Sequence, residues 1–189
     1  MKIRAAGLTT ILVAAAFLSS FAIAGPAIDA ATRAEALVVE GKTAEALDAL
    51  SEAMDALCAA SPLAFGRVVV VDSSEGYGVY SERMNKTFKP DEKLLVYVEP
   101  VCLAEGANGA LGFKADLAIE NTTGQVLGEA KDVFTISTSK RRDFSTTLSF
   151  GVPYLRPGEY KAAFTVHDQN SDKTGTFEVP FSIGLPTAN

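Results

Sequence analysis

The stretch that most constrains this chain is a proline–glycine corner followed by two runs of alternating apolar residues. The corner is Leu155-Arg156-Pro157-Gly158-Glu159-Tyr160, and the runs cover residues 161–168 and 173–183. Pro157 presets its own backbone dihedral and Gly158 tolerates a positive φ, so the pair favours a tight corner between strands. Apolar side chains at every second position indicate strands with one buried face. Turn formers at 168–172 separate the runs, which therefore predict a closing hairpin.

Other segments between residues 63 and 184 repeat this strand pattern. Residues 113–120 and 144–150 alternate apolar and polar side chains, whereas 65–71 and 94–98 are nearly continuous apolar runs, typical of strands buried on both faces. Turn formers lie at 73–76, 89–92, 106–109, 121–124 and 156–158. The pattern predicts a mainly β domain over 63–184, an antiparallel β-sandwich of seven to nine strands, followed by a frayed tail at 185–189.

Residues 25–60 have a different composition, rich in Ala, Leu and Glu, which are strong helix formers. Two apolar stripes at helical spacing, separated by Gly41-Lys42, predict a helical hairpin. Gly41, Ala46 and Ala53 resemble the small-residue positions in the second half of a tetratricopeptide repeat. A lone repeat cannot bury a core, so we expect the hairpin to cover the outer side of the sheet that contains 65–71 and 94–98.

Two motifs of the β region carry a resemblance to a known class of domain. Phe88-x-Pro90-Asp91-Glu92 leads into the run 94–99, and Leu155-x-Pro157-Gly158-x-Tyr160 precedes the closing hairpin. Together they resemble immunoglobulin-like or fibronectin type III-like domains of bacterial exported proteins, over residues 65–183. The resemblance implies a structural tyrosine corner made by Leu155, Pro157, Gly158 and Tyr160. Such domains bind proteins or glycans or act as spacers. The chain departs from the pattern because it has no tryptophan, and Ala162 stands where an immunoglobulin domain has its second core cysteine.

The N-terminal residues 1–24 read as a cleaved secretory signal peptide. Lys2 and Arg4 precede an apolar stretch over 8–21, and Ala22-Ile23-Ala24 is a small-x-small cleavage site. An uncleaved anchor is the alternative interpretation. No later segment of the sequence is long and apolar enough for a membrane span. We therefore expect a periplasmic or secreted protein.

The charge of the exported part disfavours two classes of partner. Of 17 basic residues two lie in the signal peptide, so 15 face 23 acidic residues and the net charge is −8. An acidic surface repels phosphate groups, so nucleic acid and anionic lipid are not expected partners. The one basic cluster, Lys140-Arg141-Arg142, is interpreted as a solvated loop.

Cys58 and Cys102 are the only cysteines of the chain. An even pair in an exported protein favours a disulfide, which would fasten the helical hairpin to the sheet. Two buried thiols are the alternative, because sequence alone does not give the geometry that a disulfide needs. Their spacing matches no metal motif.

The sequence offers no recognisable catalytic constellation. His167 is the only histidine, and no Gly-x-Ser-x-Gly elbow is present. Asp168-x-Asn170-x-Asp172 resembles the first half of a calcium loop, but the sixth position is Lys173 instead of Gly, so a polar hairpin turn is the competing interpretation. Gly106-x-x-Gly109-x-x-Gly112 is not followed by a helix and reads as a flexible loop. We expect no enzyme activity and no cofactor.

Aromatic residues in turns are the candidate recognition surface: Tyr77, Tyr80 and Tyr154. Tyrosines on loops can anchor protein or sugar partners, although packing at the edge of the sandwich is the simpler interpretation. The leading hypothesis is a noncatalytic exported protein that acts as a protein-binding or assembly module, with another envelope or extracellular protein as its partner. The alternatives are a carbohydrate-binding or carbohydrate-processing protein and a calcium-stabilised structural spacer. The sequence does not give the oligomeric state.

Overall fold

The computed structural model describes residues 25–90, 92–139 and 142–185. The proposed signal peptide and all but the first residue of the proposed frayed tail lie outside the described residues. The chain divides into two compact units, with the boundary between Ala53 and Met54.

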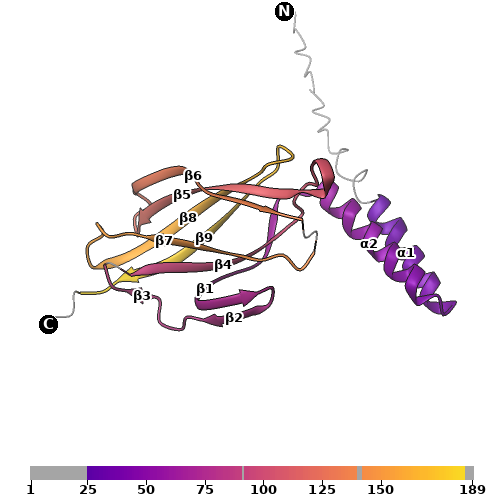
Figure 1. The fold of residues 1–189 in the computed structure, drawn as a ribbon, viewed down its shortest axis with the longest axis horizontal. Helices are drawn as coiled ribbons and strands as arrows, with labels where there is room; N and C mark the ends of the chain where they lie inside the picture. Colours follow the sequence, from indigo (N-terminus) through magenta and orange to yellow (C-terminus); the bar gives the residue numbers. More distant parts are fainter. Residues whose placement is uncertain (1–24, 91, 140–141, 186–189) are drawn as a thin grey trace, which may run out of the picture. The chain divides into compact units, whose positions relative to one another are not determined.

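The helical part is a hairpin of α1 (Gly25–Val39) and α2 (Thr43–Ala60), shown in Figure 1. The turn between them follows from Gly41, whose φ of 75° is a left-handed conformation that glycine adopts readily. The amide of Gly41 donates to the carbonyl of Val38, and the amide of Lys42 donates to Leu37, which is the hydrogen-bond pattern of a Schellman cap. Among the described residues, neither helix is both long and apolar enough to cross a membrane.

The β part is an immunoglobulin-like sandwich of two sheets, which confirms the predicted fold class (Figure 1). One sheet has the strand order β2 (Val79–Glu82), β1 (Ala64–Gly76), β4 (Lys93–Val101) and β7 (Thr146–Gly151). The other has the order β3 (Thr87–Phe88), β9 (Thr174–Ile183), β8 (Gly158–Asp168), β5 (Leu111–Asn121) and β6 (Val126–Thr138). A short 3-10 turn, η1 (Ala107–Gly109), precedes β5. The pair β3–β9 is parallel, and the pairs β8–β9 and β5–β6 are antiparallel.

The core lies between the two sheets and is built from the alternating residues of the strands. Leu94, Val96 and Val98 of β4 face Phe164 and other inward side chains of the five-stranded sheet. The Phe164 ring stacks on Phe177 with centroids 4.7 Å apart. The hairpin predicted from the two C-terminal runs is the pair β8–β9, at the centre of this sheet.

The first strand differs from its prediction. Residues 73–76, expected to form a turn, belong to β1, and the chain reverses at Tyr77-Gly78 instead. This reversal carries Tyr80 onto the outer face of β4, where its ring lies 4.5 Å from that of Tyr97, measured between centroids. Tyr97 is fully buried, and its hydroxyl accepts from the amide of Gly78 at 2.7 Å. The β1–β2 hairpin therefore covers Tyr97 on the outer face of β4.

Candidate functional site

The structure joins Cys58 and Cys102 by a disulfide, with Cα atoms 4.7 Å apart. The bond connects the end of α2 to the residue after β4. The ammonium group of Lys173 donates to the carbonyl oxygens of Cys58 at 2.5 Å and Cys102 at 3.3 Å. A charged donor shared by two backbone acceptors reinforces the same junction.

A cavity of about 550 Å³ lies beside this disulfide, and all its lining residues belong to the unit that begins at Met54. Its walls include the apolar groups of Tyr77, Leu103 and Phe144, with Lys173 as a cationic group. Tyr77 is 48% exposed there. Charged residues also line the cavity, namely Asp55, Glu105, Arg142 and Asp143. Lys173 is already engaged by the two carbonyls.

The predicted calcium residues have another role in the structure. Asp168 is buried, and its carboxylate accepts from the amides of Ala104 at 2.6 Å and Asn170 at 2.7 Å. The Asn170 side chain donates to the carbonyls of Ala104 and Ala110. These bonds fasten the glycine-rich loop to the β8–β9 turn. Among the described residues, no group of three or more His, Cys, Asp and Glu side chains is placed to hold a metal ion.

The glycine-rich loop itself is held close to that turn. A Cβ atom added at Gly106 would lie 2.3 Å from Oδ1 of Asn170, and one at Gly112 would lie 2.4 Å from Oε1 of Gln169. The Cβ atom at Gly112 would also lie 2.8 Å from the backbone carbonyl of Ile136, so this glycine is needed for close packing. The loop is built into the end of the sandwich.

Tyr160 makes the contact of a tyrosine corner, because its hydroxyl donates to the carbonyl of Arg156 at 2.8 Å. Tyr154, in the loop before this corner, is 96% exposed. It lies at the opposite end of the sandwich from Tyr77. The strand β7 ends at Gly151, which pairs with Lys93 at the start of β4, whereas Tyr77 lines the cavity near the end of β4. The three tyrosines thus do not form one recognition surface: Tyr77 and Tyr154 are far apart and Tyr80 is packed on Tyr97.

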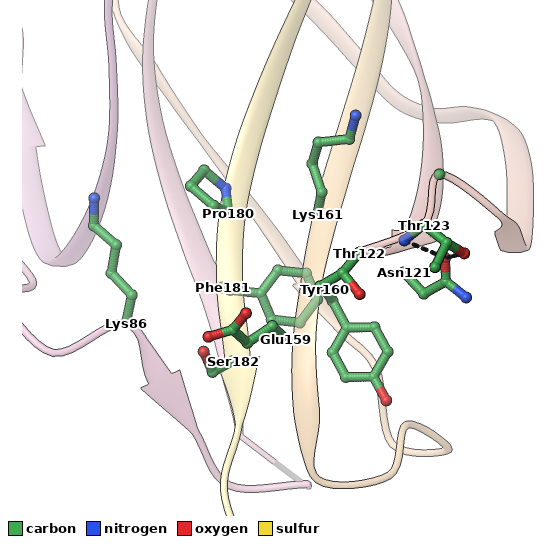
Figure 2. A pocket seen from close by; sticks show the side chains of 11 residues that line it. Lys86, Asn121, Thr122, Thr123, Glu159, Tyr160, Lys161, Pro180, Phe181 and Ser182 are labelled. Carbon is green, nitrogen blue, oxygen red and sulfur yellow. Dashed lines mark hydrogen bonds between the residues drawn. The ribbon is translucent and has the colours of Figure 1, made fainter.

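A shallow groove of about 670 Å³ runs over β8 and β9 near this corner. Figure 2 shows Lys86 and Lys161 on either side of Pro180, with Tyr160 close to the turn at Asn121. Lys161 pairs with Glu178 at 2.7 Å and Glu120 at 3.0 Å, and these carboxylates raise the pKa of its ammonium group. Lys161 of the groove is therefore already engaged by two carboxylates, which does not favour a role for it in acid–base chemistry.

His167 lies on the outer face of the five-stranded sheet, and its Nε2 is 3.1 Å from Oδ2 of Asp116. The other oxygen of Asp116 accepts from the amide of Asp132 at 2.8 Å. The pKa of Asp116 is lowered, first by this backbone hydrogen bond and then by His167. The cluster fixes a bulge in β6, because Asp132 has a φ of 51° and the register between β5 and β6 shifts there.

The strand β6 is the main feature that sequence analysis missed. It is 13 residues long, and its first eight residues, 126–133, are all exposed. Val126, Leu127 and Val133 are 49%, 45% and 39% exposed. In the sheet order β6 is terminal and pairs with β5, so its other edge presents backbone groups. The alternation of Phe134 and Ile136 with polar residues was the available signal, but it covers only the second half of the strand.

No protein-family model matches the chain, and no curated protein matches it. Among solved structures, it is similar to Spo0M, a sporulation control protein of Bacillus subtilis, with a TM-score of 0.38, 8% identity, and coverage of 67% of this chain and 51% of that one. The alkylpurine DNA glycosylase AlkC of Pseudomonas fluorescens gives a TM-score of 0.36, 12% identity, and coverage of 82% and 42%. An immunoglobulin-like protein of Pseudomonas aeruginosa gives a TM-score of 0.33, 12% identity, and coverage of 65% and 92%.

The chain spans about half of the length of the first of these structures and less of the second. At these TM-scores and identities the likenesses carry no argument about function. The tetratricopeptide resemblance of the helices rests on the residues alone, because no family model supports it.

Proposed function

We propose that this chain is a noncatalytic exported protein that binds another envelope or extracellular protein through the edge strand β6. The observation that carries the proposal is the length and exposure of this edge: eight successive exposed residues that include three large apolar side chains. A long exposed edge strand is a template for pairing with an extended segment of another chain.

The composition of β6 favours a selective partner over indiscriminate pairing. Glu129, Lys131 and Asp132 place charges along the edge, and the bulge at Asp132 interrupts the ladder. Charges and bulges are the devices by which natural sheets avoid self-pairing at an edge. A partner strand must therefore match the charges while it covers Leu127 and Val133.

Three described side chains that could support chemistry are engaged in structural contacts, which supports a binding role. Asp168 holds the glycine-rich loop, His167 contacts Asp116, and Lys161 bridges two carboxylates. A catalyst needs such groups directed at a substrate.

Site-specific photocrosslinking in the native envelope tests the proposal. A benzophenone amino acid at position 133 should give a discrete protein adduct, whereas the same amino acid at position 84 should not. Met84 is a matched control because it is 89% exposed and lies outside β6. The absence of an adduct from position 133, or an identical adduct from position 84, would refute the proposal.

Charge substitution gives a second readout. Leu127→Lys combined with Val133→Lys should abolish recovery of the partner and leave the melting temperature within a few degrees, because both side chains lie outside the buried core. Unchanged partner recovery would exclude this edge. A glycan array and a melting curve with a chelator test the carbohydrate and calcium alternatives directly.

A further inference from the structure

The strand β6 departs from regular pairing with β5 near its middle. The regular pairs on either side of this point are Ala115 with Phe134 and Leu117 with Ala130. Residues 131–133 therefore lie opposite the single residue Asp116, where a regular antiparallel ladder has one residue on each strand. The chain makes this bulge with Asp132, whose φ of 51° lies in the left-handed region. Aspartate tolerates this region, whereas β-branched residues rarely adopt it.

Contacts on the outer face of the sheet hold the bulge. The amide of Asp132 donates to the carboxylate of Asp116 at 2.8 Å. The carboxylate of Asp132 lies 2.9 Å from the ammonium group of Lys114. Nε2 of His167 lies 3.1 Å from the second oxygen of Asp116. The amide of Asp132 is thus engaged by a side chain of β5, so it does not donate to a strand at the free edge of β6.

The alternative to the bulge is a straight strand, whose register differs by two residues. Asp132 would then pair with Leu117, and the residues before it would move two positions along β5. A shift of two residues keeps these side chains on their own faces of the sheet. Asp132 itself disfavours the straight register. Leu117 packs against the apolar core, and a carboxylate beside it would lose the contact with Lys114.

A straight β6 would be complementary to itself over residues 126–134. An antiparallel pair of two copies, centred on Ala130, brings opposite charges and large apolar side chains to facing positions. The facing pairs are Glu129 with Lys131 and Leu127 with Val133. Pairs of both kinds stabilise neighbouring strands. Because β6 is the terminal strand of its sheet (Figure 1), a straight form would be a template for pairing with its own copy.

We propose that Asp132 and Asp116 determine the specificity of the β6 edge, because the bulge that they hold keeps β6 from pairing with β6 of a second copy. The edge is thereby reserved for a partner strand of a different sequence. This inference rests on the function proposed above, in which β6 binds another protein. Specificity is a difference between two affinities, and the bulge lowers the affinity of the chain for itself.

Sedimentation velocity of the purified chain over a concentration series tests this inference. The wild type should sediment as a monomer. Asp132→Val should form a dimer at concentrations at least tenfold below any at which the wild type associates, because valine disfavours a left-handed φ and suits a strand position beside Leu117. Asp132→Asn is the matched control and should stay monomeric, because asparagine is polar and tolerates the same φ. Far-UV circular dichroism checks that each variant is folded.

Reversal of one charge identifies the strands that pair. Lys131→Glu, added to the Asp132→Val chain, places carboxylates at facing positions of the dimer and should abolish it. Addition of Glu129→Lys to this chain brings opposite charges together again and should restore the dimer. A dimer of Asp132→Val that Lys131→Glu leaves unchanged would overturn the inference, because its contact would lie outside β6.

Three further results would overturn the inference: a folded Asp132→Val chain that stays monomeric, an Asp132→Asn chain that dimerises equally tightly, or a wild-type dimer that Lys131→Glu disrupts. If Asp132→Val does not fold, Asp116→Ala removes the acceptor of the Asp132 amide and should dimerise in its place. A folded Asp116→Ala chain that stays monomeric would then exclude the inference. These assays contain no partner protein, so their failure is distinct from that of the proposed function, which the adduct at position 133 reports.

Discussion

Replacing Cys58 and Cys102 by serine removes the covalent link between the end of α2 and the first sheet. The two residues are 44 positions apart, and the loop between them contains β1, β2, β3 and β4. In the chain-entropy model, a bond that closes a loop of this length restricts the unfolded chain by about 4 kcal/mol at 25 °C. The free energy of unfolding of the double variant should therefore be lower than that of the wild type by up to about 4 kcal/mol.

For a chain of this size, 1 kcal/mol corresponds to about 2–4 °C in the melting temperature, so we expect a decrease of about 8–16 °C. Circular dichroism melting curves of the oxidised wild type and of the double variant measure it. A reductant should lower the wild-type midpoint by a similar amount and leave the variant unchanged. A double variant that melts within 2 °C of the oxidised wild type would refute the reasoning, because the bond would then not constrain the unfolded chain.

Three further substitutions test other contacts of the sandwich. Gly175→Ala places a Cβ atom 2.6 Å from a backbone carbonyl and should lower the free energy of unfolding by about 1–3 kcal/mol. Urea denaturation measures this change. Gly128→Ala is the control, because its added Cβ atom has nothing within 4 Å and should leave the free energy of unfolding unchanged. Tyr160→Phe removes a 2.8 Å hydrogen bond and should cost about 0.5–1.5 kcal/mol; an equal loss from Tyr154→Phe, at a 96% exposed side chain, would contradict this. The pKa of Asp116 is lowered in the folded state, so its ionised carboxylate stabilises the fold. This stabilisation is present above the pKa of the unfolded chain and is lost as the pH falls through the pKa of the folded state. Asp116→Asn should therefore reduce the loss of stability below about pH 4, and a variant with the acid-unfolding curve of the wild type would exclude this contribution.

The elements with strong periodicity could be predicted from sequence. The alternation over residues 161–168 and 173–183 predicted a hairpin, which the structure contains as β8–β9. The hydroxyl of Tyr160 donates to the backbone, as a tyrosine corner requires. The helices follow from Ala-rich stripes and from a glycine that ends α1. In each case the signal lies in residues close together in the chain, where side-chain spacing and backbone preference act locally.

The candidate site depended on contacts that sequence spacing does not encode. Tyr77 and Tyr154 both lie in turns, but β4 separates them, because one turn is at each end of that strand. Asp168 has the spacing of a calcium ligand, yet its carboxylate is satisfied by the amide of Ala104, 64 residues away. The strand β6 was missed because its residues 126–133 are all exposed. A segment at a sheet edge with no buried face lacks the alternation of apolar and polar residues that predicts a strand.

The sequence by itself determined the mainly β class, the helical hairpin and the corner at Pro157-Gly158, because these depend on backbone preferences and apolar periodicity within short segments. Only the tertiary structure decided that β6 lies at a sheet edge and that alanines of the helices are buried while most of their large apolar residues stay exposed. Both depend on which segments become neighbours, and strand order and helix rotation are set by packing across the whole chain.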